Sequence, residues 1–338
     1  MKRLYAILVF ILAFIISGCV ISPRRSGSGT PGGGTPGTGG QLYVSTPNSI
    51  LRFSNAEAVN GNTGPTATIT SSAFSSPQHI VVDTTNDRLY VANRGGRSIL
   101  VFDNASTLTG SVTPTRVISG ASTGLANPID VAVDTINDLL YVADGTTILL
   151  FAQASTDNGN LQPTTINMGI TIGGLFLDAA NDQLYVSDPA DNVVDRLDNA
   201  SGQNTVGIVG GAIAGPDTLL SQPRGLALDG SGRLLVGNSA TPISITTYGS
   251  AGVATGDVVP FANISGSNTQ LQSPQQMVLN GNILNGELYV VDPVAASILI
   301  YTNTSTVTGN LAPARVINGA NTGLAVNSIN GIALDTTR

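Results

Sequence analysis

Four polar residues stand out in this sequence because their side chains could support chemistry: His79, Asp130, Arg224 and Gln276. Each lies at or next to the position four residues before an Asp or Asn that ends a short apolar run. A histidine beside a carboxylate can act as a general base, and the side chains of Arg and Gln donate hydrogen bonds to ligands. We therefore predict that these four residues line a small polar ligand pocket.

The sequence contains little evidence that these residues are catalytic. His79 is the only histidine in the chain, which excludes a multi-histidine metal site and argues against a zinc hydrolase. No local motif such as Gly-x-Ser-x-Gly marks a nucleophile. We predict no catalytic residue, no metal and no cofactor, and we interpret His79 as a hydrogen-bonded histidine of the pocket rather than a general base.

The elements that must position these residues recur along the chain. Each recurrence is an apolar run that ends in Asp or Asn, followed by a turn and a Leu-Tyr-Val-like run. The runs end at Asp83, Asp134, Asp178, Asp229, Asn280 and Asp335, at intervals of 51, 44, 51, 51 and 55 residues. A repeat of this size, made of short strands, is typical of a β-propeller blade. The sequence thus predicts an all-β, six-bladed β-propeller, with the four polar residues near one entrance of its central channel.

One repeat shows the expected order of strands within a blade. Residues 79–83 are predicted to form the inner strand, 89–93 the second, 99–102 the third, and a segment near 114–118 the outer strand. The runs are almost continuously apolar, a pattern typical of strands that are covered on both faces. In a propeller, the neighbouring blades provide this cover.

The two ends of the repeat region complement each other. The first repeat starts at the second strand, residues 42–44, whereas the last repeat stops at an inner strand, residues 331–335. We predict that this last strand completes the first blade and closes the ring, which removes an exposed sheet edge.

Two further sets of polar residues recur once per blade. The first set could hold metal ions, but turn capping is the simpler interpretation of both, because Asp and Asn side chains accept backbone N–H bonds in tight turns. A local Ca²⁺ site near Asp83 or near Asp178 stays open, although the spacing of a known calcium loop is absent. A recurring Tyr in the second strand is interpreted as packing between blades. The three sets are Asp83, Asp134, Asp178, Asp229 and Asp335; Asn93, Asp144, Asp188, Asn238 and Asp292; and Tyr43, Tyr90, Tyr141, Tyr185 and Tyr289.

The third repeat resembles a known family. The run from Asn127 to Asp134, then Asn137-Asp138 and Leu140 to Asp144, resembles an NHL repeat, and the chain is similar to bacterial six-bladed NHL-type propeller lipoproteins over about residues 41–338. The resemblance implies a fold more than an activity, because the family includes scaffolds, binding modules and a few enzymes. Related lactonases hold a central metal with Glu, Asn and Asp, and neither Glu57 nor Glu287 falls on an inner strand here.

The N-terminal segment predicts where in the cell the protein is located. Lys2 and Arg3 precede 13 apolar residues, too few for a spanning helix, and the run ends in Ile-Ser-Gly-Cys. Residues 1–18 are therefore predicted to be a lipoprotein signal peptide, and Cys19, the only cysteine, the lipidated residue. The rest of 19–40 is a Gly/Pro/Thr-rich flexible linker. By family analogy, Val20 after the cysteine favours the outer membrane.

The charge of the chain limits the kinds of partner that it is expected to bind. Without Lys2 and Arg3, 12 basic residues face 21 acidic ones, a charge near −9, and every remaining base is Arg. This disfavours nucleic-acid binding, which needs a basic surface. We expect a lipid-anchored, non-enzymatic propeller of the cell envelope that contacts the membrane through its lipid and binds a protein or glycan partner. Two alternatives stay open: an enzyme at the channel mouth (a lactonase-like hydrolase or a lyase), and a structural component of an envelope assembly.

Overall fold

The computed structural model describes residues 39–204, 207, 209–280, 286–304 and 306–338. The predicted signal peptide, Cys19 and all but the last two residues of the predicted linker lie outside these residues. The described part belongs to one compact unit, Pro36–Arg338. None of the helices in this part has the length and hydrophobicity that a membrane span requires.

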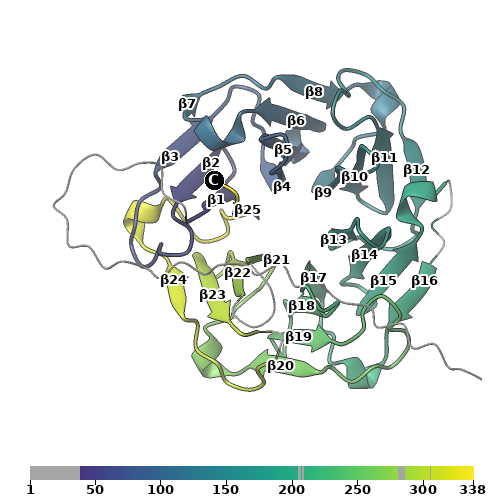
Figure 1. The fold of residues 1–338 in the computed structure, drawn as a ribbon, viewed down its shortest axis with the longest axis vertical. Coiled ribbons are helices and arrows are strands. Elements are labelled where there is room, and N and C mark those ends of the chain that lie inside the picture. The colour runs from purple at the N-terminus through teal and green to yellow at the C-terminus, as the bar shows by residue number, and fades with distance from the viewer. Residues whose placement is uncertain (1–38, 205–206, 208, 281–285, 305) are drawn as a thin grey trace, which may run out of the picture. The chain divides into compact units, whose positions relative to one another are not determined.

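Six β-sheets surround a central channel and form a six-bladed β-propeller, as predicted (Figure 1). Strands are given from the channel outward. Blade 1 contains β25 (Gly331–Asp335), β1 (Gln41–Ser45), β2 (Ser49–Ser54) and β3 (Ala67–Thr70), and the two-residue β7 (Gly110–Ser111) pairs parallel with β3 at its outer edge. Blade 2 contains β4 (Pro77–Asp83), β5 (Arg88–Asn93), β6 (Ser98–Asp103) and β8 (Arg116–Ser119). Blade 3 contains β9 (Pro128–Asp134), β10 (Leu139–Asp144), β11 (Thr147–Ala152) and β12 (Thr164–Asn167).

The other three blades repeat this order. Blade 4 contains β13 (Gly174–Asp178), β14 (Gln183–Asp188), β15 (Val193–Asp198) and β16 (Val209–Ile213). Blade 5 contains β17 (Pro223–Leu228), β18 (Leu234–Asn238), β19 (Ser244–Tyr248) and β20 (Ala262–Ser265). Blade 6 contains β21 (Gln276–Asn280), β22 (Glu287–Asp292), β23 (Ser297–Thr302) and β24 (Arg315–Ile317). The loops hold short 3-10 turns: η1 (Arg94–Gly96), η2 (Ala105–Thr107), η3 (Ala121–Thr123), η4 (Ala200–Gly202), η5 (Pro216–Thr218), η6 (Ser267–Thr269) and η7 (Ala320–Thr322).

The hydrophobic core is divided among the seams between neighbouring blades. In one seam, Tyr141 and Ile148 of blade 3 share a buried cluster with Leu184 and Val186 of blade 4. Because each blade is packed on both faces, both sides of its middle strands are apolar. The five recurring tyrosines are all buried, which confirms their interpretation as packing residues.

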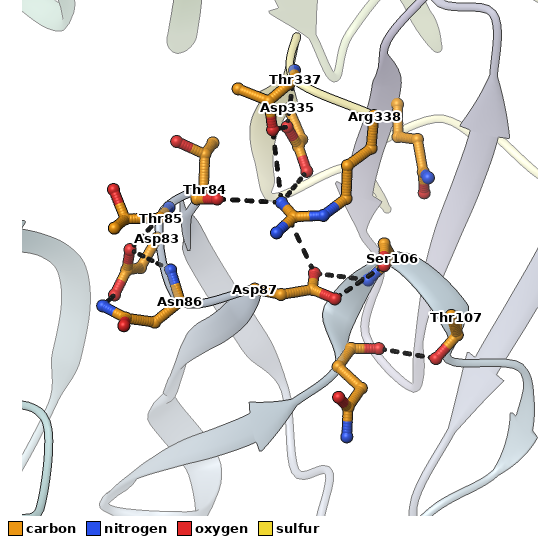
Figure 2. A network of polar contacts seen from close by, with 12 residues as sticks. Asp83, Thr84, Thr85, Asn86, Asp87, Ser106, Thr107, Asp335, Thr337 and Arg338 are labelled. Carbon is orange, nitrogen blue, oxygen red and sulfur yellow. Dashed lines mark hydrogen bonds and ion pairs between the residues drawn. The ribbon is translucent and has the colours of Figure 1, made fainter. Parts of the chain in front are cut away.

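The ring closes as predicted. Strand β25 pairs antiparallel with β1 in a register that places Leu334 opposite Leu42 and Ile332 opposite Val44. The C-terminal residue then ties blade 1 to blade 2 (Figure 2): Arg338 Nη1 donates to the carbonyl oxygen of Thr84 at 2.9 Å and to Asp335 Oδ2 at 2.9 Å.

Arginine side chains join several blades. In blade 6, Arg315 Nη1 donates to the carbonyl oxygens of Ala56 and Val59 in blade 1, at 2.9 and 2.7 Å. In blade 2, Arg116 Nη1 reaches Ala154 O of blade 3 at 2.8 Å. A planar guanidinium can satisfy several carbonyl groups at once, which a lysine ammonium does less well. This role accounts for part of the chain's preference for Arg.

Outer strands are joined to the next blade by a glycine of its outer loop. The five parallel bridges among the described residues pair Gly61 with Ile317, Gly110 with Ile69, Gly159 with Ile118, Gly256 with Ile213 and Gly309 with Ile264. Each glycine has a positive φ, which other residues rarely adopt. This regular recurrence of glycine is a further repeat signal in the sequence.

Candidate channel site

The inner strands follow one another around the channel in the order β25, β4, β9, β13, β17 and β21 (Figure 1). We call the end where these strands begin the upstream mouth and the end where they finish the downstream mouth. Four residues before the end of each apolar run, at the upstream mouth, the six blades carry His79, Asp130, Gly174, Gly225, Gln276 and Gly331. Half of these equivalent positions are therefore glycine.

The three glycines allow the inner strands to approach closely at the upstream mouth. A Cβ atom on Gly174 would lie 2.6 Å from the carbonyl oxygen of Arg224, and one on Gly331 would lie 2.6 Å from the Cα atom of His79. A Cβ atom on Gly225 would likewise overlap the carbonyl group of Gln275. Side chains at these positions would push the blades apart, so only blades 2, 3 and 6 carry side chains at this level.

Asp130 is the centre of the polar group at the upstream mouth. Its carboxylate accepts backbone N–H bonds from Val131 at 2.7 Å and from Leu175 of blade 4 at 2.8 Å. The Nδ1 atom of His79 in blade 2 lies against Asp130 Oδ1. From blade 6, Gln276 Nε2 donates to Asp130 Oδ2 at 3.4 Å. Asp130 is 1% exposed, so these partners replace the water that it would bind on the surface.

The contact between Asp130 and Gln276 spans the channel. Strands β9 and β21 lie three positions apart around the ring in either direction, so their blades face each other. The residues His79, Asp130 and Gln276, here called the polar cluster, thus come from three blades and cross the channel near its upstream mouth.

The structure does not bring Arg224 into the polar cluster. Gly225, one residue later, occupies the equivalent position, and Arg224 is half-buried on β17. Its carbonyl oxygen accepts a hydrogen bond from Ser187 Oγ at 2.9 Å. Its guanidinium forms no hydrogen bond or ion pair with any described residue. The predicted four-residue site is thus three residues in contact and one nearby.

The downstream mouth is built from turn caps. Asp83 Oδ1 accepts the backbone N–H groups of Thr85 and Asn86, each at 3.0 Å (Figure 2). Asp134 does the same for Ile136 and Asn137, at 2.8 and 3.0 Å. These contacts confirm turn capping as the role of the recurring Asp. Within the described ranges, no group of three His, Cys, Asp or Glu side chains is placed to hold a metal ion.

The second recurring polar set follows the turn prediction only in part: Asp188 caps its own turn through the N–H of Ala190 at 2.9 Å, whereas other members bond to the loop that enters the inner strand, 17 or 18 residues earlier. Asp144 accepts the N–H groups of Ala126 and Asn127, each at 2.8 Å, and Asn238 Oδ1 accepts the N–H of Ser221 at 3.0 Å. Burial raises the pKa of Asp144, and the hydrogen bonds from Ala126 and Asn127 act in the opposite direction.

The channel itself contains a cavity of about 340 Å³, lined mostly by aliphatic residues together with polar groups that include His79 and Gln276. The residue just before the end of each apolar run contributes to the wall, and all six are partly exposed. These aliphatic residues, here called the aliphatic ring, are Val82, Val133, Leu177, Leu228, Leu279 and Leu334. A cavity with an apolar wall and a few convergent polar groups has the character of a small-molecule site.

A second concave region lies between blades 4 and 5 on the downstream face. This cavity, of about 400 Å³, is lined by Asp178 and Asn181 of blade 4 and by Ser231, Gly232 and Val253 of blade 5, among others. The sequence pattern does not predict this cavity, because the cavity depends on which loops of two blades meet.

The loop between β19 and β20 of blade 5 carries three exposed apolar residues, of which Val253 lines this groove. The exposed fractions of Val253, Val259 and Phe261 are 74%, 67% and 57%. The Arg233 guanidinium lies over the Phe261 ring, 4.6 Å from its centre. We call Arg233, Val253, Val259 and Phe261 the blade 5 patch.

Comparison with known proteins bears on the fold. No protein-family model and no curated protein matches the chain. A chain in the crystal structure of a nidogen/laminin complex is similar over 88% of this chain and 98% of its own length, with a TM-score of 0.63 and 15% sequence identity. A hydrazine synthase structure from Kuenenia stuttgartiensis is similar over 67% of this chain and 55% of that chain, with a TM-score of 0.44 and 15% identity. The first likeness supports the propeller fold alone, and the resemblance to NHL repeats stays a prediction.

Proposed function

We propose that this protein is a lipid-anchored β-propeller of the bacterial cell envelope that binds a protein partner without catalysing a reaction. The signal peptide, Cys19 and linker predicted from the sequence would hold the ring near the outer membrane. The propeller would then serve as a rigid support for the loops that contact the partner.

The observation that carries the proposal is the blade 5 patch. Three of the eight large apolar side chains that are exposed in the described part of the chain lie on this one loop, and Val253 lines the groove, on a surface made mainly of Thr, Ser, Asn and Gly. Aromatic residues and Arg are enriched in protein interfaces, where they often supply most of the binding energy. Arg233 and Phe261 stack on each other and so restrict each other's motion. Less side-chain entropy is therefore lost when a partner binds.

Membrane attachment is tested by changing the predicted lipidated residue. We expect the wild-type protein in the membrane fraction of the cells that produce it, and the Cys19→Ala variant in the soluble fraction. If the variant stays with the membrane to the same extent, the lipid anchor is wrong.

Partner binding is tested by photo-crosslinking in the same cells. A photoreactive amino acid at Val253 should capture one discrete protein, and the same label at Val326 should not. Val326 is a matched control because it is 62% exposed and lies before β25, on the upstream side. A captured product that is equal at both positions, or absent at Val253, would contradict the proposal. The variant Phe261→Ser should reduce the yield at Val253.

A further inference from the structure

The central channel has the features of a second binding site, independent of the blade 5 patch. Its wall carries the aliphatic ring, and the polar cluster crosses it near the upstream mouth. A ligand with an apolar body would cover the partly exposed side chains of all six blades.

The polar cluster leaves two hydrogen-bonding atoms unused. The Nδ1 atom of His79 faces Asp130, and its Nε2 atom has no partner among the described residues. Gln276 donates to Asp130 through Nε2, and its Oε1 atom likewise has no partner in the described part of the chain. Both residues line the cavity, so both free atoms belong to side chains that a ligand in the channel would meet.

The chemistry of these two atoms defines the end group of the ligand. The amide Oε1 of Gln276 is an acceptor, and Nε2 of an imidazole donates or accepts according to whether it carries a proton. The ligand must therefore bring a donor for Gln276 in a group that can also accept, which a hydroxyl does. A carboxylate brings no donor for Oε1 and would lie near the carboxylate of Asp130, so its desolvation would be poorly compensated.

We propose that the channel binds one unbranched aliphatic alcohol, with its chain inside the aliphatic ring and its hydroxyl group on His79 and Gln276. Because the polar cluster crosses the upstream end, the alcohol enters from the downstream mouth. Asp130 does not touch the ligand in this arrangement. It positions the His79 ring and the Gln276 amide and leaves Nε2 and Oε1 for the ligand.

Calorimetric titration of the full chain carrying Cys19→Ser, which removes the lipid, tests the site with 1-octanol and octanoate as probes. We expect saturable binding of one 1-octanol per chain, and binding of octanoate that is weaker by at least about tenfold. The absence of saturable 1-octanol binding overturns the site. Octanoate binding as tight as that of 1-octanol overturns the assigned end group.

Substitutions in the channel test whether 1-octanol binds there. Gln276→Met, which removes the acceptor and keeps the length, should weaken 1-octanol binding about threefold to tenfold. Val133→Phe and Leu279→Phe, which fill the channel from two blades, should each abolish binding. Val294→Phe, in an exposed turn of blade 6, is the matched control and should bind as wild type. Binding that survives in both channel-filling variants places the alcohol elsewhere and contradicts the proposal, whatever the crosslinking at Val253 gives.

Discussion

The two mouths of the channel are made by the same six strands, but their polar side chains have different roles. At the downstream mouth, Asp83 and Asp134 bond to the backbone of their own turns, within three residues. At the upstream mouth, Asp130 bonds to residues of blades 2, 4 and 6. The first arrangement repeats from blade to blade, whereas the second occurs once.

This contrast indicates where individual chemistry arises in a repeat protein. A turn cap depends only on its neighbours in sequence, so the same residue solves the same problem in every blade. The polar cluster depends on which blades face each other, so its residues differ. Glycines at the other three positions leave it the necessary space.

Truncation should have the largest effect, because it removes one strand from both mouths. Deletion of residues 329–338 removes β25 and exposes the partners of the buried Ile329 and Ile332. Loss of their burial, at about 1.5 to 3 kcal/mol each, should lower the melting temperature by on the order of 10 °C. Deletion of 336–338 alone is the control and should cost much less. A melting temperature that does not change in the longer deletion would show that the ring is not closed by β25.

Two aspartates on one strand compare the mouths directly. Asp130 and Asp134 are both almost fully buried on β9. Asp130→Ala should lower the free energy of unfolding by about 2 to 4 kcal/mol, because it leaves buried donors from several blades without a partner. Asp134→Ala should lower it by about 0.5 to 2 kcal/mol, the range for a lost cap. Urea denaturation measures both, and equal losses would remove the distinction between the mouths.

Substitutions at two glycines distinguish the cost of steric crowding from the cost of an unfavourable backbone conformation. Gly225→Ala places a methyl group against the carbonyl of Gln275 at the upstream mouth and should cost about 1 to 3 kcal/mol. Gly232→Ala, in a downstream turn, meets no atom within 4 Å but has φ of +71°, so its cost of about 1 kcal/mol is conformational. Thermal melts should therefore rank Gly225→Ala as the more damaging change. The reverse order would mean that the upstream mouth is not crowded.

Two carboxylates on β15 can be compared in the same way, by the effect of their charge on stability. Substitutions at these residues should change the free energy of unfolding least. Burial, together with the charge of Asp188, raises the pKa of Asp195 to about 6 from its ordinary value of 3.8. The hydrogen bond from Arg196 lowers the pKa of Asp198. An acid with a raised pKa keeps its proton longer in the folded state, so charged Asp195 destabilises the fold above pH 6.

The variant Asp195→Asn mimics the protonated acid. It should raise the free energy of unfolding at pH 7.5 by about 1 to 2 kcal/mol, and this gain should fade as the pH falls from about 6 to below 4. Asp198→Asn should have the opposite sign: it should destabilise at pH 7.5, with a loss that fades as the pH falls below 3.8. Denaturation curves at several pH values check both signs. A pH-independent effect of Asp195→Asn would exclude a raised pKa.

The fold was largely predictable because it rests on local periodicity. The strands, the caps and the closure by residues 331–335 follow from residues that recur at fixed offsets. The same offset pointed to His79, Asp130 and Gln276, but it placed Arg224 with them, although Gly225 holds the equivalent position. Contacts across the channel and between loops depend on the curvature of the ring, which no offset encodes. The polar cluster's geometry and the blade 5 patch therefore needed the structure.

A double-mutant cycle between His79 and Asp130 tests most directly whether residues from separate blades act as one unit. The free energies of unfolding of His79→Ala, Asp130→Ala and the double variant would be measured in urea. We expect a coupling energy of about 1 to 3 kcal/mol, and none beyond about 0.5 kcal/mol for His79 with Asp134 at the other mouth. Additive losses for His79 and Asp130 would contradict the account.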